Sequence, residues 1–569
     1  MLPLAALLII VVEFCERLCF YTFSGTQKIW LQDQGVPNAQ ASSIHLAFTT
    51  LTFASAFAGG WLATTGLGMF RTILISAVLY AIGTFISAIA TLPGVENVTL
   101  YNIAFMGLIG LGGGGIKSNV NVFGADQLEA EGSKESFFIY FYWTIKMGSF
   151  FAHSFLSTVA VSGLPALGVT EEYGCFFTYM VAASCMLLGL ITFAGGSRAY
   201  KTERQAQAAS KHELSPMAEF VAQLVGARSK PRGLAALLGW SLVPLMIVLS
   251  LIYAFHKKSA ALMMLTLSVD VLCFVFLLVA HWDNSWLPVG DVSKCLDSVP
   301  LLLVGNIFMG FQWGLGDVNF QSEACQLDTR WDRGNPDAYQ MSGDFFRLGV
   351  PVGILVGAPL LDQLVFPLIA RCIGRKVPLC SKIVAGIFFG ICANLVAAAI
   401  EQARRSAGST GVPSKCAPLL PDGTHVLASD LSAFVMFAPY LLVGIGEAFW
   451  APAMYQLAYA GAPARMKPLL QAFNLFSMGA MPSAISASIT RVVAPLVPND
   501  LDSGNIAAVF MIIAGLGVVG IALFAAAYRS ASEDVKMVGR GDSVQLVHDP
   551  KQTAEGSIGN PQIGTAGGA

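Results

Sequence analysis

Long apolar runs, separated by short polar segments, recur along almost the whole chain. A helix needs about 20 predominantly apolar residues to cross a bilayer, and the runs match that length. No basic segment precedes the first run and no small-residue cleavage site follows it, so we interpret it as a spanning helix rather than a signal peptide. The pattern predicts fourteen membrane-spanning helices, at 3–30, 41–63, 70–92, 99–121, 136–162, 173–194, 234–255, 260–280, 298–318, 340–369, 380–401, 431–455, 466–495 and 504–528.

The composition is typical of a polytopic membrane protein. Of the 569 residues, 55% are hydrophobic and 12% are charged, and the mean hydropathy is +0.64. A soluble protein carries about 25% charged residues. The net charge of −2 argues against a nucleic-acid partner, and most of the 11 scattered cysteines are expected to be packed thiols. The sequence contains no recognisable nucleophile–base pair, phosphate loop or metal-ligand cluster, so we do not expect an enzyme.

Basic residues in the connecting segments predict the orientation. The stretch 195–233 contains seven Lys or Arg, and the segments 371–382 and 464–467 are also basic. Counting helices from an inside N-terminus places all three on one side, which the positive-inside rule makes cytoplasmic. We therefore expect a multi-pass protein with a cytoplasmic C-terminus, and we expect it in the plasma membrane.

The spacing of the runs predicts an all-α membrane protein of the major facilitator architecture, in which two six-helix bundles enclose a site near the middle of the bilayer. A channel, a receptor or a membrane enzyme could also have many spans. The predicted division is a six-helix bundle at 1–195, a basic cytoplasmic linker at 196–233, two inserted helices at 234–282, a second six-helix bundle at 297–530 and a disordered tail at 531–569.

Charged residues interrupt the first apolar run. Residues three and four apart share one face of a helix, so Glu13, Glu16, Arg17, Phe20 and Tyr21 form a single stripe. An unpaired charge in the middle of a bilayer costs several kcal/mol, about 3 or more, so this stripe must face protein or a water-filled cavity. Arg17 can pair with Glu13, while Glu16 needs another cation. The stripe predicts either a proton-binding site or a structural ion pair.

The fourth run supplies a second cation for this stripe. Lys117 lies in the apolar interior and follows the sequence GGGG, which allows neighbouring helices to approach closely. A buried lysine without a partner would lose its proton or reach toward the membrane surface. Pairing of Lys117 with Glu13 or Glu16 would satisfy both the lysine and the carboxylate.

These segments resemble the proton-coupled oligopeptide transporters, a branch of the major facilitator superfamily. EFCERLCFY at 13–21 resembles the motif E-x-x-E-R-F-x-Y-Y, and GGGGIKSNVNVFGADQ at 112–127 resembles the signature of the fourth helix. The resemblance continues at 135–150, 338–372 and 444–471, and the two inserted helices match those of bacterial members.

The resemblance implies roles for several residues. The glutamates that match Glu13 and Glu16 are linked to the proton in this family. The residues that match Arg17 and Lys117 form salt bridges with them and are implicated in holding the carboxylate of the peptide. Tyr21 matches a tyrosine that lines the pocket. No cofactor is expected beyond the proton, which serves as the coupling ion.

Departures from the family pattern concern the substrate. Lys146 replaces an asparagine of the fifth helix, Gln456 replaces a glutamate linked to the peptide amine, and Phe345 replaces an asparagine of the eighth helix, with Arg347 close behind. An anion is lost and cations are gained, so the amine-binding part of the site is predicted to be dismantled. The alternative is that Lys146 pairs with Glu447 or another acid, and that Arg347 faces the cytoplasmic cavity or the membrane surface.

The resulting prediction is a proton-coupled symporter of di- and tripeptides that works by alternating access. Its expected partners are a small-molecule substrate, protons and the lipid bilayer. A transporter of a small anion, such as nitrate or a carboxylate, is the alternative substrate assignment. A membrane sensor that has kept the fold without transporting is the alternative from another functional class.

Overall fold

The computed structural model describes residues 2–63, 67–128, 131–201, 216–256, 259–420, 422–463 and 466–540. Each predicted run coincides with one helix or with consecutive helical segments. In the described part of the chain, 11 helices are long and apolar enough to cross a membrane. The three other runs lie at 4–33, 131–162 and 467–492, and the first of these contains the charged stripe.

Six spans make up the N-half, our name for residues 4–195. Its elements are α1 (Leu4–Asp33), α2 (Asn38–Ala63), α3 (Gly68–Ala90), α4 (Val98–Asn102), η1 (Ile103–Gly110), α5 (Leu111–Lys117), α6 (Val120–Ala125), α7 (Glu131–Phe151), η2 (Ala152–Leu156), α8 (Ser157–Ser162), η3 (Pro165–Leu167), η4 (Glu171–Tyr173) and α9 (Gly174–Gly195). Within it α1 packs against α7 and α9, and α2 packs against α5.

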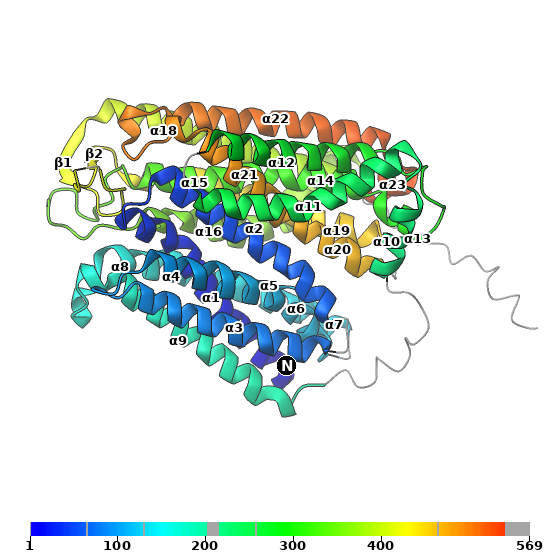
Figure 1. Cartoon of the computed structure of the whole chain (residues 1–569), viewed down its shortest axis with the longest axis horizontal. Coiled ribbons are helices and arrows are strands. Elements are labelled where there is room, and N and C mark those ends of the chain that lie inside the picture. Colours follow the sequence, from blue (N-terminus) through cyan, green and yellow to red (C-terminus); the bar gives the residue numbers. More distant parts are fainter. Residues whose placement is uncertain are drawn as a thin grey trace, which may run out of the picture.

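Six further spans make up the C-half, our name for residues 291–530. They comprise α13 (Asp291–Leu296), α14 (Val299–Gly310), η6 (Phe311–Leu315), α15 (Gly316–Ala324), η7 (Gly343–Leu348), α16 (Gly349–Leu360), η8 (Leu361–Val365), α17 (Phe366–Ile373), α18 (Leu379–Ala407), η9 (Ala433–Met436), α19 (Phe437–Ala460), α20 (Lys467–Leu475), η10 (Phe476–Ala480), α21 (Met481–Val492), η11 (Ala494–Leu496), η12 (Leu501–Ser503) and α22 (Ile506–Ser530). In Figure 1 the blue-to-cyan N-half and the green-to-orange C-half form two groups of long helices.

Two inserted helices, α11 (Pro231–Phe255) and α12 (Ala260–His281), pack on each other and on the transmembrane core. The buried Asp270 of α12 accepts a hydrogen bond of 2.7 Å from Ser488 Oγ of α21. Arg491 Nη2 donates to the carbonyl of His256, 2.9 Å away. These polar contacts fix the insert against α21 within an otherwise apolar surface.

The molecule has two distinct ends. At the hairpin end, strands β1 (Ser409–Pro413) and β2 (Leu427–Ser429) pair in antiparallel fashion, and a disulfide joins Cys325 to Cys416. At the opposite end, which we call the linker end, lies α10 (Pro216–Gly226) (Figure 1). The disulfide was not predicted, because most of the cysteines were expected to be packed thiols and no pairing was assigned.

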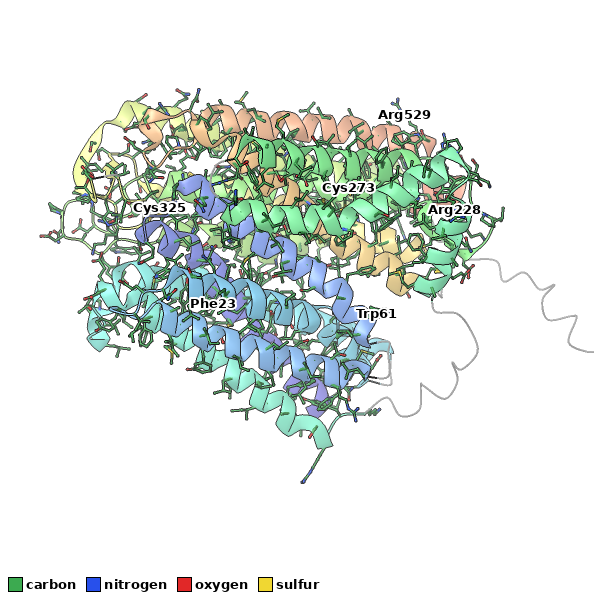
Figure 2. All side chains as sticks on the ribbon, in the orientation of Figure 1. Phe23, Trp61, Arg228, Cys273, Cys325 and Arg529 are labelled. Atoms are coloured by element: carbon green, nitrogen blue, oxygen red, sulfur yellow. A yellow bond between two sulfur atoms is a disulfide. The ribbon has the colours of Figure 1, made fainter. Side chains whose placement is uncertain are left out.

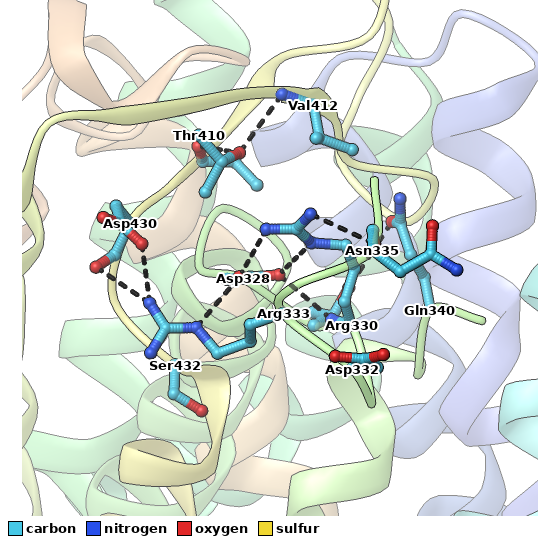
Figure 3. A network of polar contacts seen from close by, with 12 residues as sticks. Asp328, Arg330, Asp332, Arg333, Asn335, Gln340, Thr410, Val412, Asp430 and Ser432 are labelled. Atoms are coloured by element: carbon cyan, nitrogen blue, oxygen red, sulfur yellow. Dashed lines mark hydrogen bonds and ion pairs between the residues drawn. The ribbon is translucent and has the colours of Figure 1, made fainter. Parts of the chain in front are cut away.

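A network of ion pairs stabilises the loops at the hairpin end (Figure 3). Arg330 Nε and Nη2 donate to the two oxygens of Asp328, each at 2.9 Å. Arg333 bridges Asp328 at 3.1 Å and Asp430 at 2.6 Å. All of these residues belong to the C-half, so the network holds its loops as one unit.

The two halves are joined at the hairpin end by hydrogen bonds between them. Lys28 Nζ of α1 donates to Val318 O at 2.5 Å, and Gln321 Nε2 of α15 donates to Gly25 O at 2.8 Å. Helix α2 packs along α21, where Ser43 Oγ donates to the carbonyl of Ala487. The contact between the halves is therefore polar as well as apolar.

The prediction of a disordered tail from residue 531 onward is wrong for its first part. Residues Glu533–Arg540 form α23, and Val535 and Val538 of this helix are buried. The helix packs against α18, and Gly539 lies close to Cys380 and Tyr528. The remaining tail residues, 541–569, and linker residues 202–215 lie outside the described residues.

Candidate functional site

The charged stripe of α1 and Lys117 at the end of α5 form a compact group, which we call the inner cluster. Arg17 Nε donates to Glu13 Oε1 at 2.6 Å and lies 3.4 Å from Glu16 Oε2. Lys117 Nζ is 2.9 Å from Glu16 Oε1. Two acids and two bases thus meet, as the sequence predicted, and the partner of Lys117 is Glu16 rather than Glu13.

The inner cluster is almost completely removed from solvent. Glu13 is 1% exposed and Glu16 is 0% exposed, while Arg17 retains 13% exposure. Buried ions are tolerated when their charges are paired and hydrogen-bonded. Lys117 Nζ also lies 3.7 Å from the ring centroid of Phe20, which adds a cation–π contact. A proton added to either glutamate would therefore weaken an ion pair inside this neutral group.

The glycines of α5 explain how Lys117 reaches α1. A Cβ on Gly114 would lie 2.0 Å from Ser55 Oγ, and one on Gly59 would lie 2.6 Å from the Cα of Gly115. Helices α2 and α5 are therefore in backbone contact, which larger residues would prevent. The close packing holds the end of α5, and with it Lys117, at a fixed depth beside α1.

A second ion pair links the two halves beside the inner cluster. Lys146 Nζ of α7 lies 3.3 Å from Glu447 Oε1 of α19. The sequence analysis considered Lys146 as an added cation that would repel an ammonium group, and left pairing with Glu447 as the alternative. The structure has the alternative arrangement. An acidic side chain, Glu447, is thus present on the C-half side of the site.

Arg347 is also paired rather than free. Its Nη2 lies 2.9 Å from Asp317 Oδ2, and its Nη1 lies 3.9 Å from Asp344 Oδ1. Together with Lys146, it accounts for both cations that the departures from the family pattern had added. The predicted excess of positive charge is therefore wrong for these two positions, because each has an acidic neighbour supplied by a distant part of the chain.

The three remaining predicted residues, Tyr21, Phe345 and Gln456, lie in different surroundings. Tyr21 continues the stripe of α1, and its ring centroid is 5.5 Å from that of His153. Phe345 contacts Phe346 and Phe434 and lines a surface pocket near Trp331.

Gln456 is exposed on α19 and does not lie on the same face as Glu447. The two are nine residues apart on one helix, and a turn of about 100° per residue places their side chains on opposite sides. Helix α19 therefore carries an acid, Glu447, on the side opposite to Gln456.

A group of titratable residues lies near the hairpin end, and of its members the sequence analysis named only Arg347. We call it the outer cluster; its best-defined pair is His153 Nδ1 and Asp344 Oδ2, 2.6 Å apart. Each member is a titratable residue within an apolar run of the sequence, and this was the signal that could have revealed the group. Its members are Lys28, His45, His153, Asp317, Asp344 and Arg347. In the described residues no group of three or more His, Cys, Asp or Glu is arranged to hold a metal ion.

Comparison with known proteins decides the family. The model of the POT family matches residues 70–499. The chain belongs to the POT family. It is therefore a multi-pass integral membrane protein, in agreement with its apolar helices.

Curated relatives in the POT family cover different parts of the chain. "Solute carrier family 15 member 2" of Danio rerio is 31% identical over 35% of this chain and 28% of its own length. "Solute carrier family 15 member 1" of Rattus norvegicus is 24% identical over 74% of this chain and 54% of its own length. "Probable peptide transporter ptr2" of Schizosaccharomyces pombe is 24% identical over 84% of this chain and 71% of its own length. The chain thus spans about half the length of the rat relative.

A solved structure agrees in fold. The crystal structure of the POT family transporter PepTSo is 22% identical, covers 94% of this chain and 99% of its own, and superposes with a TM-score of 0.70. The predicted all-α major facilitator fold is thereby confirmed. The relatives and the solved structure named here are carriers and transporters, which agrees with the expectation that the chain is not an enzyme.

Proposed function

We propose that this POT family member is a proton-coupled symporter of di- and tripeptides that works by alternating access between the N-half and the C-half. The observation that carries the proposal is the inner cluster, a buried and paired set of two acids and two bases. A structural ion pair would need one acid and one base. The additional carboxylate and amine provide a group that can take up a proton and rearrange its pairing.

Coupling would proceed through the inner cluster. Protonation of Glu16 removes the attraction that holds Lys117 at 2.9 Å, and protonation of Glu13 releases Arg17. The freed cations are then available to the carboxylate of the peptide, so that a proton and a peptide favour the same state. Tyr21 lies on the same face of α1 and would contact the bound substrate.

The amino end of the peptide would be read on the opposite half. Glu447 is an acid that is 26% exposed, and its partner Lys146 can be displaced by a peptide ammonium group. We therefore assign the substrate site to Arg17, Tyr21, Lys117, Lys146 and Glu447, and leave out Phe345 and Gln456. The alternative of a small-anion transporter rests on added cations at Lys146 and Arg347, and its support is weaker because both are paired with acids.

The predicted division of the chain and its orientation belong to this proposal. The two bundles and the inserted helices supply the moving units, and the basic linker end faces the cytoplasm together with the C-terminus. The hairpin end with its disulfide then faces the oxidising side of the membrane, which is where disulfides persist. We propose the plasma membrane as the location, and the proton as the coupling ion.

Uptake into proteoliposomes under an imposed inward proton gradient tests the function. We expect dialanine to accumulate above its external concentration, N-acetylated dialanine to enter poorly, and a protonophore to abolish accumulation. Nitrate and a dicarboxylate serve as comparison substrates. Gradient-driven nitrate uptake without dipeptide uptake would show the anion assignment to be right and the peptide assignment wrong.

A further inference from the structure

We propose that an apolar cavity at the linker end binds the acyl chain of a membrane phospholipid. We call it the linker-end cavity. Its volume is about 230 Å³, and its lining comes from α2 of the N-half, from α10 and α11, and from α13, α14, α20 and η10 of the C-half. Neither the inner cluster nor the proposed substrate site contributes a residue to it.

The lining offers nothing that would hold water. In the described part of the chain, every side chain that lines the cavity is hydrocarbon or carries sulfur, apart from Trp240. Trp240 Nε1 donates to His281 Nε2 at 3.1 Å, so its polar N–H is directed to a residue outside the lining. A buried water needs 2–4 polar partners, whereas an apolar cavity of about 150 Å³ stays dry and binds benzene. The linker-end cavity therefore suits a hydrocarbon guest.

The cavity reaches the lipid-facing side of α11. Pro244 lines the cavity and is itself exposed. Beside it on the same helix, Leu245 and Val248 are 42% and 50% exposed, and α11 is one of the apolar spans. Exposed apolar side chains of a span face the lipid tails, which are as apolar as leucine. A lipid tail at Pro244 can therefore enter the cavity without crossing water.

Helix α10 covers the cavity at the membrane surface. Met217 and Phe220 of this helix line the cavity, while Val221 and Val225 are 47% and 42% exposed. The helix has 11 residues, which is too short to cross a bilayer. A short helix with apolar side chains on its outer surface as well is suited to lie in the interface, where lipid headgroups meet lipid tails.

Basic residues follow α10 directly and supply a place for the headgroup. Arg228 and Lys230 are exposed, and Figure 2 shows Arg228 at the linker end. Lys230 Nζ also donates to the carbonyl of Trp286 at 2.7 Å, and Arg232 pairs with Asp283. Arginine binds phosphate well, and basic groups beside a span attract lipid headgroups. We therefore place the phosphate beside Arg228 and the acyl chain in the cavity.

A bound acyl chain would join the two halves. Ala54 and Phe57 belong to α2 of the N-half, whereas Leu470 and Phe473 belong to α20 of the C-half, and all four line the cavity. Separation of α2 from α20 would remove one wall from the chain. By linkage the bound lipid favours the arrangement described here and slows the cycle, a consequence that rests on the alternating-access function proposed above.

Photocrosslinking from the bilayer tests the site. The probe is phosphatidylcholine with a diazirine near the end of one acyl chain, in phosphatidylcholine vesicles that contain the unaltered protein. We expect label on Leu470 and Phe473, which are 1% and 4% exposed and so lie away from the outer lipid. Leu245 and Val248 report lipid on the outer surface. Label confined to these two exposed positions, as mapped by mass spectrometry, would overturn the proposal.

Two variants separate the cavity from the outer surface. Val243→Trp fills the cavity, so label on Leu470 and Phe473 should fall to the background of a sample that is not irradiated. Val248→Trp adds the same bulk on the outer side and should keep the label. If Val243→Trp does not fold, Val243→Phe takes its place. Full label on Phe473 in the filled variant would overturn the proposal.

A second probe distinguishes a phospholipid from a free hydrocarbon chain. A long-chain alkyl diazirine without a headgroup is compared with the phospholipid probe at equal mole fraction. Arg228→Glu should lower labelling by the phospholipid about fivefold and leave labelling by the alkyl probe unchanged. Labelling of the cavity by the alkyl probe alone would overturn the phospholipid assignment, and an equal response of both probes to Arg228→Glu would overturn the place of the headgroup.

Transport gives an independent measurement. Val243→Trp acts as a permanent occupant, so its initial rate of dialanine uptake should be about fivefold or more below that of Val248→Trp. Equal rates would reject the effect on the cycle. Crosslinking needs neither substrate nor proton gradient. Absence of label from the cavity with normal dialanine uptake would reject the lipid site alone, and label in a protein that does not take up dipeptides would reject the substrate assignment alone.

Discussion

The inner and outer clusters have similar residues but differ in which parts of the molecule they connect. Every member of the inner cluster belongs to the N-half, where Glu16 and Lys117 are 101 residues apart. The outer cluster draws His153 from the N-half and Asp344 from the C-half. When the halves rock against each other, the contacts within the inner cluster stay in place. The contact between His153 and Asp344 in the outer cluster must break when the hairpin end opens. The inner cluster can thus keep a bound proton while the halves move, whereas the contacts of the outer cluster depend on the conformation.

The largest effect is expected when the inner cluster loses a titratable group. Glu16→Gln keeps the size of the side chain but removes the charge that binds Lys117, so uptake should no longer respond to the proton gradient. We expect concentrative dialanine uptake to be abolished while counterflow exchange partly survives, as measured in proteoliposomes. Full gradient-driven uptake in both Glu13→Gln and Glu16→Gln would contradict the role of the cluster.

Removal of the cation should affect both transport and stability. Lys117→Ala leaves Glu16 with Arg17 alone, and breaking a buried ion pair from one side costs about 3–5 kcal/mol. We expect loss of proton-driven uptake and a lower melting temperature, with insertion preserved. Lys376→Ala, at an exposed site, is the control. Normal transport by Lys117→Ala would mean that the link from α1 to α5 is structural only.

The ion pair of Lys146 and Glu447, which joins the two halves near the inner cluster, should govern recognition of the peptide's amino group. Glu447→Gln removes the acid that pairs with Lys146, and one misplaced charge in a partly desolvated site is worth about tenfold or more in affinity. We expect weaker competition by dialanine and unchanged competition by N-acetylated dialanine. Gln456→Ala should change neither. A larger loss in Gln456→Ala than in Glu447→Gln would restore the assignment first made from the sequence.

The smallest effect concerns the loop network of the C-half, which does not connect the halves. Burial acts to raise the pKa of Asp328, but hydrogen bonds from Arg330 and Arg333 outweigh it and hold this pKa below its ordinary value. The stabilisation is therefore present above the unfolded pKa of about 3.9 and is lost as the pH falls through the lower folded value. Hydrogen exchange of residues 408–432 should stay slow at pH 5.5 and accelerate only below about pH 4. Acceleration already near pH 6.5, after correction for the intrinsic pH dependence of exchange, would contradict the role of Asp328 in this network.

The order of spans and the inner cluster could be predicted from the sequence. Apolar length fixed the number and place of the helices, because a bilayer accepts backbone only when its hydrogen bonds are satisfied locally. The stripe of Glu13, Glu16 and Arg17 follows from the helical repeat within one short segment. Pairing of Lys117 with this stripe could also be predicted, because a buried cation requires an anion and few anions occur in the apolar runs.

The contacts between the halves were decided only by the tertiary structure. Lys146 and Glu447 are 301 residues apart, and no local periodicity specifies which faces of α7 and α19 meet. The same holds for His153 and Asp344, and for α23, which buries two valines and packs against α18 and α19. The sequence determines which charged residues need a partner. The packing of distant helices selects that partner, because an ion pair requires a separation of a few ångströms, which only the assembled bundles define.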